Sequence, residues 1–214
     1  MDNKFFFNII TCILLVSAYP SDARGLKKSV SESTIKANIS ESRVNWTGKK
    51  PTGEHHGYVK LSGGEILMEH NEITGGSFTI DLNSIANTDL GDKNAGSKLV
   101  SHLKSPEFFD VNKYPTAKFV ISSVDRIPNH QAEPGLRKAT HRIEGDLTIK
   151  GITRKISFEA SINLLNGKLT ASSVPFAIDR TQWGVNYQSK KIFPNLKDEF
   201  IYDDIILKID LVSN

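Results

Sequence analysis

The feature that most constrains this chain is a strict alternation of apolar and polar residues, which recurs from residue 43 to the C-terminus. It is clearest over residues 142–150, where the apolar or small positions are Ile143, Gly145, Leu147 and Ile149. Successive side chains of a β-strand point to opposite faces, so this period of two predicts strands with one buried and one wet face. Because strands of a parallel sheet are buried on both faces, the pattern indicates an antiparallel sheet.

The same alternation appears in four further segments. Their inward positions are Phe78, Ile80 and Leu82, then Ile156, Phe158, Ala160 and Ile162, then Val174, Phe176 and Ile178, and finally Ile205, Leu207, Ile209 and Leu211. Asn166-Gly167 and Lys150-Gly151 predict tight hairpins, because both central residues of such a turn must tolerate positive φ. The pattern gives about eight strands. A polar loop at 127–138 connects two of them, and no linker is long enough to divide the chain, so we predict one all-β domain, a sandwich or a barrel.

A helical segment at about residues 94–110 interrupts the strands. The apolar stripe that predicts it consists of Ala95, Leu99, His102 and Leu103. Ser105 followed by Pro106 predicts a second helical start, with serine as N-cap, and its turn carries Phe108 and Phe109. The segment is either a lid for one end of a barrel or a helix that merely seals the core.

Residues 1–23 have the features of a cleaved signal peptide. Lys4 precedes an apolar run, Phe5 to Ala18, that is shorter than the roughly 20 apolar residues of a spanning helix. An uncleaved anchor and lipidation at Cys12, the only cysteine, stay open as alternatives. Cleavage would leave a barrel domain at 33–214 without cysteine or membrane span, as suits a periplasmic or secreted protein.

Composition and motifs exclude several function classes. With 27 basic and 24 acidic side chains and a net charge of +3, the chain lacks the dense basic face that nucleic-acid binding requires. The histidines are scattered, and the adjacent His55 and His56 would face opposite sides of a strand, so no metal site is expected. Phosphate-binding glycine loops, nucleophile elbows and zinc-protease motifs are missing, so no catalytic residue is assigned.

A few residues allow two interpretations. His102, on the apolar stripe, is either a satisfied core histidine or a hydrogen-bond partner for a polar ligand head. Asp179, next to Arg180, is either a salt-bridged strand end or a polar group at a pocket mouth. Trp46 and Trp183 are either core aromatics or residues that line a cavity.

Several segments resemble the YceI-like family of bacterial envelope proteins. The matching segments are Val44–Lys50, Thr74–Asp81, His102–Val111, Lys113–Phe119, Gly145–Thr153, Asp179–Gly184 and Asp203–Leu207. Together they span nearly the whole chain after the expected signal peptide. Two features depart from the family pattern: Pro106 stands where an acidic residue is common, and the loop at 128–138 is longer than usual.

The resemblance implies a lipocalin-like fold, an eight-stranded antiparallel barrel with a helix against it. It also implies that the barrel holds an isoprenoid lipid or isoprenoid quinone, with no separate cofactor. Burying such a tail contributes about 25 cal/mol per Å² of apolar surface, so binding needs no charge pair. The expected ligand contacts are Phe78, Ile80, Leu99, His102, Leu103, Phe108, Phe109, Phe119, Ile121, Leu147, Ile149, Phe158, Phe176, Ile178, Asp179 and Trp183.

Two other functions stay open beside lipid storage or transport. One is an enzyme that acts on a lipid in the same barrel, with His102 or Asp179 as acid/base. The other is a secreted interaction module that uses the barrel as a scaffold. Edge strands and an exposed helix also permit a homodimer.

Overall fold

The computed structural model describes residues 32–128 and 138–214. The signal peptide expected at 1–23 and most of the loop expected at 127–138 lie outside these ranges. The elements in chain order are β1 (Glu32–Lys36), β2 (Arg43–Lys50), β3 (Gly53–Glu69), β4 (Glu72–Asn87), α1 (Lys93–Lys104), β5 (Thr116–Arg126), β6 (His141–Ile149), β7 (Ile152–Leu165), β8 (Lys168–Ser173), β9 (Phe176–Asp179), the 3-10 helix η1 (Arg180–Trp183) and β10 (Asp204–Val212).

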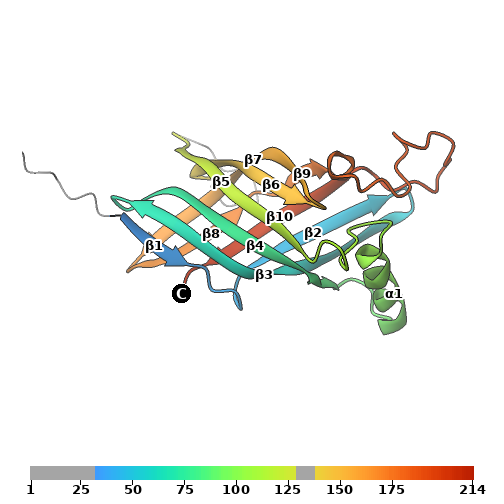
Figure 1. The fold of residues 1–214 in the computed structure, drawn as a ribbon, viewed down its shortest axis with the longest axis horizontal. Helices are drawn as coiled ribbons and strands as arrows, with labels where there is room; N and C mark the ends of the chain where they lie inside the picture. Colours follow the sequence, from blue (N-terminus) through green and yellow to red (C-terminus); the bar gives the residue numbers. More distant parts are fainter. Residues whose placement is uncertain (1–31, 129–137) are drawn as a thin grey trace, which may run out of the picture.

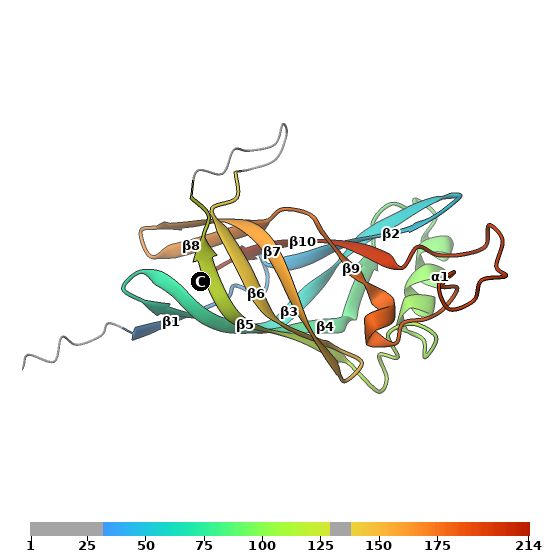
Figure 2. The same cartoon turned by 90° about the horizontal axis from the view of Figure 1, so that it is seen from above.

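The strands form an elongated barrel (Figure 1, Figure 2). Neighbouring strands follow the order β3-β2-β10-β8-β7-β6-β5-β4, and the pairing of β4 with β3 closes the ring. Every pairing between these strands is antiparallel. The predicted eight-stranded antiparallel barrel is therefore confirmed.

Two short strands lengthen the barrel wall without adding to the ring. The long strand β3 pairs with β2 over its first half and with β1 over its second half. In the same way, β10 pairs with β9 near its start and with β8 near its end. Pro175 separates β8 from β9, because proline has no N–H for a ladder. The segment predicted as one strand with Val174, Phe176 and Ile178 thus begins only at Phe176.

The predicted hairpins and inward positions are observed. Asn166 and Gly167 join β7 to β8 with φ values of 51° and 80°. Lys150 and Gly151 join β6 to β7 with φ values of 49° and 73°. The inward Gly145 has a steric reason, since a Cβ there would lie 2.5 Å from Cζ of the Phe119 ring.

The helical segment is shorter than predicted. Asp92 caps α1, accepting a hydrogen bond from the Asn94 backbone N–H, and the helix ends at Lys104. Ser105 is its C-cap and not the N-cap of a second helix; its hydroxyl is buried without a partner. The chain continues as turns, closed by a hydrogen bond of 2.8 Å from the Asp110 N–H to the Ser105 carbonyl. The prediction of helix up to residue 110 is therefore wrong.

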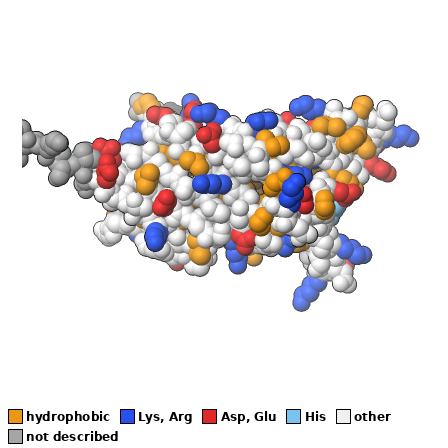
Figure 3. All heavy atoms as spheres, viewed as in Figure 1, with side chains coloured by type: hydrophobic (Ala, Val, Ile, Leu, Met, Phe, Trp, Pro, Cys, Tyr) orange, Lys and Arg blue, Asp and Glu red, His pale blue; other side chains and the backbone are white. Residues whose placement is uncertain are grey.

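The face of the barrel seen in Figure 3 is mixed. Acidic and basic side chains are interspersed over it, with scattered hydrophobic side chains between them. Within the two described ranges, no helix is long and apolar enough to cross a bilayer.

Candidate functional site: an apolar cavity inside the barrel

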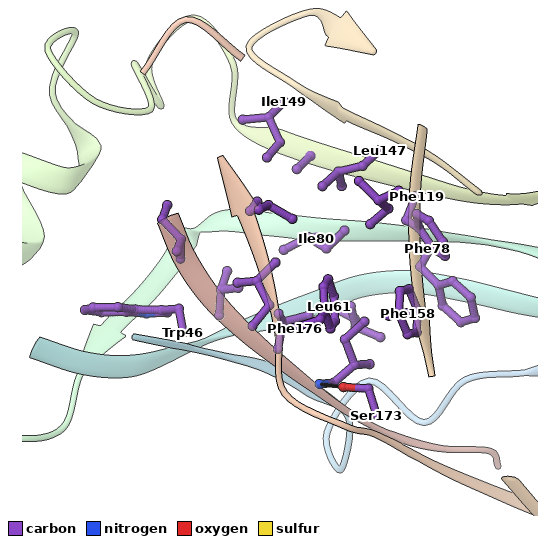
Figure 4. A pocket seen from close by; sticks show the side chains of 18 of the residues that line it. Trp46, Leu61, Phe78, Ile80, Phe119, Leu147, Ile149, Phe158, Ser173 and Phe176 are labelled. Atoms are coloured by element: carbon purple, nitrogen blue, oxygen red, sulfur yellow. Dashed lines mark hydrogen bonds between the residues drawn. The ribbon is translucent and has the colours of Figure 1, made fainter. Parts of the chain in front are cut away.

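The barrel is hollow. It encloses a cavity of about 270 Å³, many times the roughly 10–15 Å³ that one water molecule needs. The wall is almost entirely apolar and includes Phe78, Phe119 and Leu147 (Figure 4). An empty apolar cavity has no hydrogen-bond partners for water, so it favours an apolar guest.

Alternation along the strands builds this wall. All four inward positions predicted on β7 and all four predicted on β10 line the cavity. Their neighbours along each strand point outward, as the period of two requires. The apolar lining is thus a direct consequence of the pattern that also forms the sheet.

Aromatic rings meet across the interior. Phe158 stacks on Phe176 with ring centroids 4.6 Å apart and an interplanar angle of 10°. Phe119 also contacts Phe158, with ring centroids 5.7 Å apart and an interplanar angle of 44°. Figure 4 shows Phe78, Phe119 and Phe158 together at one side of the view and Trp46 at the opposite side, with Phe176 between them.

Among the residues that the structure describes, the ionisable side chains that line the cavity all lie at one end. They are Lys49, Lys50 and His55 on the β2–β3 hairpin, and Arg180 of η1. Ile201 and the exposed Tyr202 border the same end, and the Tyr202 N–H donates to the Lys49 carbonyl at 2.9 Å. We name this end, defined by Lys49, Lys50, His55, Ile201 and Tyr202, the mouth.

His55 is held in place by Asp89, which lies between β4 and α1. Nδ1 of His55 is 2.8 Å from Oδ2 of Asp89, and the His56 N–H donates to Oδ1, also at 2.8 Å. Burial by itself would raise the pKa of Asp89, but hydrogen bonds from His55, the His56 N–H and the Asn87 amide lower it to about 2. As predicted, the two histidines diverge: His55 lines the mouth and His56 is exposed.

Arg180 ties the segments at this end together. The guanidinium is 2% exposed and donates to the carbonyls of Val185, Ile201 and Tyr202 at 2.7, 3.1 and 3.3 Å. It also forms an ion pair with Asp203 at 3.4 Å. Burial lowers the pKa of Arg180, and the nearby carboxylates oppose that effect. Its donors are thus satisfied by the protein.

All the aliphatic residues and phenylalanines predicted as ligand contacts line the cavity. They are Phe78, Ile80, Leu99, Leu103, Phe108, Phe109, Phe119, Ile121, Leu147, Ile149, Phe158, Phe176 and Ile178. Leu99 and Leu103 come from α1, and Phe108 and Phe109 from the turn that follows. The helix therefore contributes to the cavity wall, as a lid would, and does not only seal packed core.

Three predicted site residues lie outside the lining. Asp179 caps η1, accepting from the Thr181 N–H at 2.9 Å, and its other oxygen pairs with Lys191 at 3.2 Å. Trp183 is 1% exposed and donates its Nε1–H to the Leu147 carbonyl at 3.0 Å. Both side chains therefore have structural partners, and neither lines the cavity.

His102 is the third residue outside the lining. Its Nε2 lies 2.8 Å from Oε2 of Glu107. Its ring packs edge-on against Phe108 and Tyr187, with centroids 4.9 and 4.6 Å apart. This position is on the outer side of the aromatic cover, because Phe108 lines the cavity and His102 does not.

Trp46 is a lining residue that the sequence left ambiguous. It lies on β2, opposite Gly57 of β3 and Leu207 of β10, and it borders the cavity. Its indole Nε1–H is buried and has no hydrogen-bond partner. A donor without a partner is uncommon in a folded protein. The described lining also contains Ser173 and the ionisable groups of the mouth, but the Trp46 Nε1–H is a buried donor of the wall that has no partner.

Groups of three or more potential metal ligands do not occur among residues 32–128 and 138–214. The site as described therefore consists of an apolar cavity, a mouth with charged groups and one unpaired indole N–H.

Several relatives of known sequence are similar to part of this chain. A UPF0312 protein of Pseudomonas putida F1 is 39% identical over 62 residues, which are 29% of this chain and 28% of the relative. A UPF0312 protein of Staphylococcus aureus USA300 is 29% identical over 93 residues, 41% of this chain and 46% of the relative. The matched segments thus span less than half the length of either relative.

Two solved structures share the fold. BcnA of Burkholderia cenocepacia superposes with a TM-score of 0.63 at 20% identity, covering 83% of this chain and 99% of BcnA. A polyisoprenoid binding domain from Saccharophagus degradans, implicated in plant cell wall breakdown, superposes with a TM-score of 0.56 at 12% identity, covering 86% and 98%. Finally, the model of the YceI-like domain matches residues 34–213. With almost the whole barrel inside that match, the chain belongs to the YceI-like family.

Proposed function

We propose that this chain binds a long-chain isoprenoid lipid in its barrel, without chemical conversion, to store or transport it. The observation that carries the proposal is the cavity of about 270 Å³ with its nearly unbroken apolar wall. Each Å² of hydrocarbon surface removed from water contributes about 25 cal/mol, so several isoprene units supply the affinity. The shared fold with a polyisoprenoid binding domain supports this ligand class.

Trp46 favours a ligand with an oxygen acceptor, of the isoprenoid-quinone type. A plain hydrocarbon would leave its Nε1–H unpaired, whereas a quinone or ether oxygen in the cavity would accept a hydrogen bond from it. The polar group also fixes how far the tail slides into the barrel, and so contributes specificity more than affinity.

The compartment follows from the expected signal peptide. A chain exported after cleavage near residue 23 would work in the periplasm or outside the cell, where an insoluble lipid needs a carrier between membranes. The absence of cysteine after Cys12 suits an oxidising compartment.

The test is to identify what the purified protein carries. Protein expressed in a bacterial host is extracted with organic solvent, and the extract is analysed by mass spectrometry. We expect an isoprenoid lipid, with a quinone head, in stoichiometric amounts. Folded protein that yields no lipid, and takes none up when incubated with an isoprenoid quinone, would overturn the proposal.

A matched pair of variants ties the lipid to the cavity. Ala117 is buried, lines the cavity and pairs with Ile80 of β4, whereas Ala177 is exposed on β9. Ala117→Phe inserts a ring into the cavity and should abolish lipid retention, although overpacking also destabilises by about 1–3 kcal/mol. Ala177→Phe adds the same ring outside and should retain lipid as the wild type does.

A further inference from the structure

Large apolar side chains are exposed on the segment that connects η1 to β10. Phe193 is 50% exposed and Ile192 43% exposed, and they are adjacent in this segment. Tyr202, at the mouth, is 48% exposed. Exposed bulky apolar side chains grouped in one place mark a surface that meets another apolar phase or a partner. We name Ile192, Phe193 and Tyr202 the apolar tip.

The apolar tip and the mouth are joined by direct backbone contacts. The Phe193 N–H donates to the Ser189 carbonyl at 2.8 Å, and Ser189 forms a parallel bridge with Ile201. Tyr202 follows Ile201 and donates to the Lys49 carbonyl. Figure 1 shows this segment beside the ends of β2 and β10, and Figure 3 shows hydrophobic side chains gathered over the same end. Because Tyr202 belongs to both, a surface that covers the whole apolar tip also meets the edge of the mouth.

Lysines flank the apolar tip. The stretch from Gln188 to Pro194 contains Lys190 and Lys191 and no acidic residue. Both lysines are exposed: Lys190 lies 4.8 Å from the Phe200 ring centroid, and Lys191 reaches Asp179 with a side chain that is 66% exposed. Lys50, exposed on the mouth, adds a further positive charge. Apolar side chains bordered by lysine fit the interface of a bilayer that contains anionic lipid.

We propose that the apolar tip docks on an anionic phospholipid bilayer and so brings the mouth against the membrane. The inference rests on the proposed function, since a carrier must take its lipid from a bilayer or deliver it to one. Ile192 and Phe193 enter the acyl boundary, while Lys190 and Lys191 stay among the phosphates. A lipid tail then passes between bilayer and cavity with little exposure to water.

The test is flotation with phosphatidylcholine vesicles, with and without phosphatidylglycerol. The wild-type chain should float with the phosphatidylglycerol vesicles and less with pure phosphatidylcholine. The variant I192D/F193D should reduce the ratio of bound to free protein about tenfold or more, because two apolar side chains no longer enter the bilayer and two negative charges are added. Equal flotation of variant and wild type, or no flotation of the wild type, overturns the inference.

The control variant L67D/L165D makes the same charge change elsewhere. Leu67 and Leu165 are 43% and 63% exposed, and Leu165 lies in the β7–β8 hairpin at the end of the barrel away from α1 (Figure 1, Figure 2). This variant should float as the wild type does. If both variants lose flotation equally, charge alone explains the loss and the tip is not a docking surface.

Lipid content separates this inference from the proposed function. Mass spectrometry of I192D/F193D should find the same retained lipid as in the wild type, because Ile192 and Phe193 do not line the cavity. Vesicle binding without retained lipid would refute the proposed function alone, and retained lipid without vesicle binding would refute the docking alone. A size-exclusion shift of the wild type to a dimer that I192D/F193D abolishes, without vesicle binding, would assign the tip to a second copy of the chain and overturn the inference.

Discussion

The Phe158 ring of β7 lies parallel to the Phe176 ring of β9, with centroids 4.6 Å apart. In the described sheet β9 pairs with β10 and is off the path that joins β10 to β7. The stack therefore bridges a part of the barrel wall where side chains, and not ladder hydrogen bonds, join the two strands. Both rings also line the cavity.

This stack predicts an energetic coupling between the two residues. In a double-mutant cycle with Phe158→Leu and Phe176→Leu, we expect a coupling energy of about 0.5–1.5 kcal/mol, the range typical of aromatic pairs. The measurement is urea unfolding of the wild type, the two single variants and the double variant, provided that all four have the same m-value. Strictly additive effects would show that the rings stabilise the barrel independently and that the wall is held here by other contacts.

We expect Arg180 to stabilise the segment that borders the mouth. Arg180→Met removes the donor to three carbonyls and leaves Asp203 without its partner. The expected loss of unfolding free energy is about 3 kcal/mol, because buried acceptors and a carboxylate lose their pairing. Arg180→Lys should recover only part of it, since an ammonium group lacks the planar fork of the guanidinium. Hydrogen exchange should increase in residues 185–203; unchanged exchange there would contradict the role assigned to Arg180.

The sequence predicted the barrel well because the relevant signal is local. Whether a residue points inward depends on its position along one strand, so β6, β7 and β10 could be assigned from alternation alone. The hairpins at Asn166 and Lys150 depend on two adjacent residues that accept positive φ. The apolar positions of the cavity wall follow from the same pattern.

The parts that could not be predicted depend on contacts distant in sequence. Alternation marks Trp46 as an aromatic residue on a strand, but the missing partner of its Nε1–H depends on what β3 and β10 place around it. His102 lies on the apolar stripe of its helix, yet Glu107 and Tyr187 hold it outside the cavity. Trp183 is buried, as an aromatic core residue would be. It lies in the short helix η1 and donates its Nε1–H to the Leu147 carbonyl, and it does not line the cavity.

The lowered pKa of Asp89 predicts how the free energy of unfolding changes with pH. Its pKa is lowered from 3.8 to about 2 in the folded protein, so its contribution is fully present above about pH 4 and is lost as the pH falls towards 2. The contribution is about 1–2 kcal/mol, and Asp89→Asn should remove it. The measurement is thermal or urea unfolding between pH 2 and pH 5: the stability gap between wild type and D89N should narrow with acid. A gap that does not change over this range would show that Asp89 is not held in its ionised form by His55 and the His56 N–H.

A substitution at Trp46 should change which ligand the protein prefers more than it changes the stability of the fold. Trp46→Phe keeps an aromatic ring at the cavity wall and removes a buried donor that has no partner. The smaller ring lowers the free energy of unfolding, but removal of the unpaired donor should offset part of that loss. Binding of an isoprenoid quinone should weaken about three- to tenfold, the equivalent of one hydrogen bond. Binding of a saturated hydrocarbon of similar length should not weaken in the same way. Competition between the two ligands, measured by fluorescence or by mass spectrometry of the retained lipid, tests this difference. Equal loss for both ligands would mean that Trp46 contributes ring area alone, and that the indole N–H has no part in selecting the lipid.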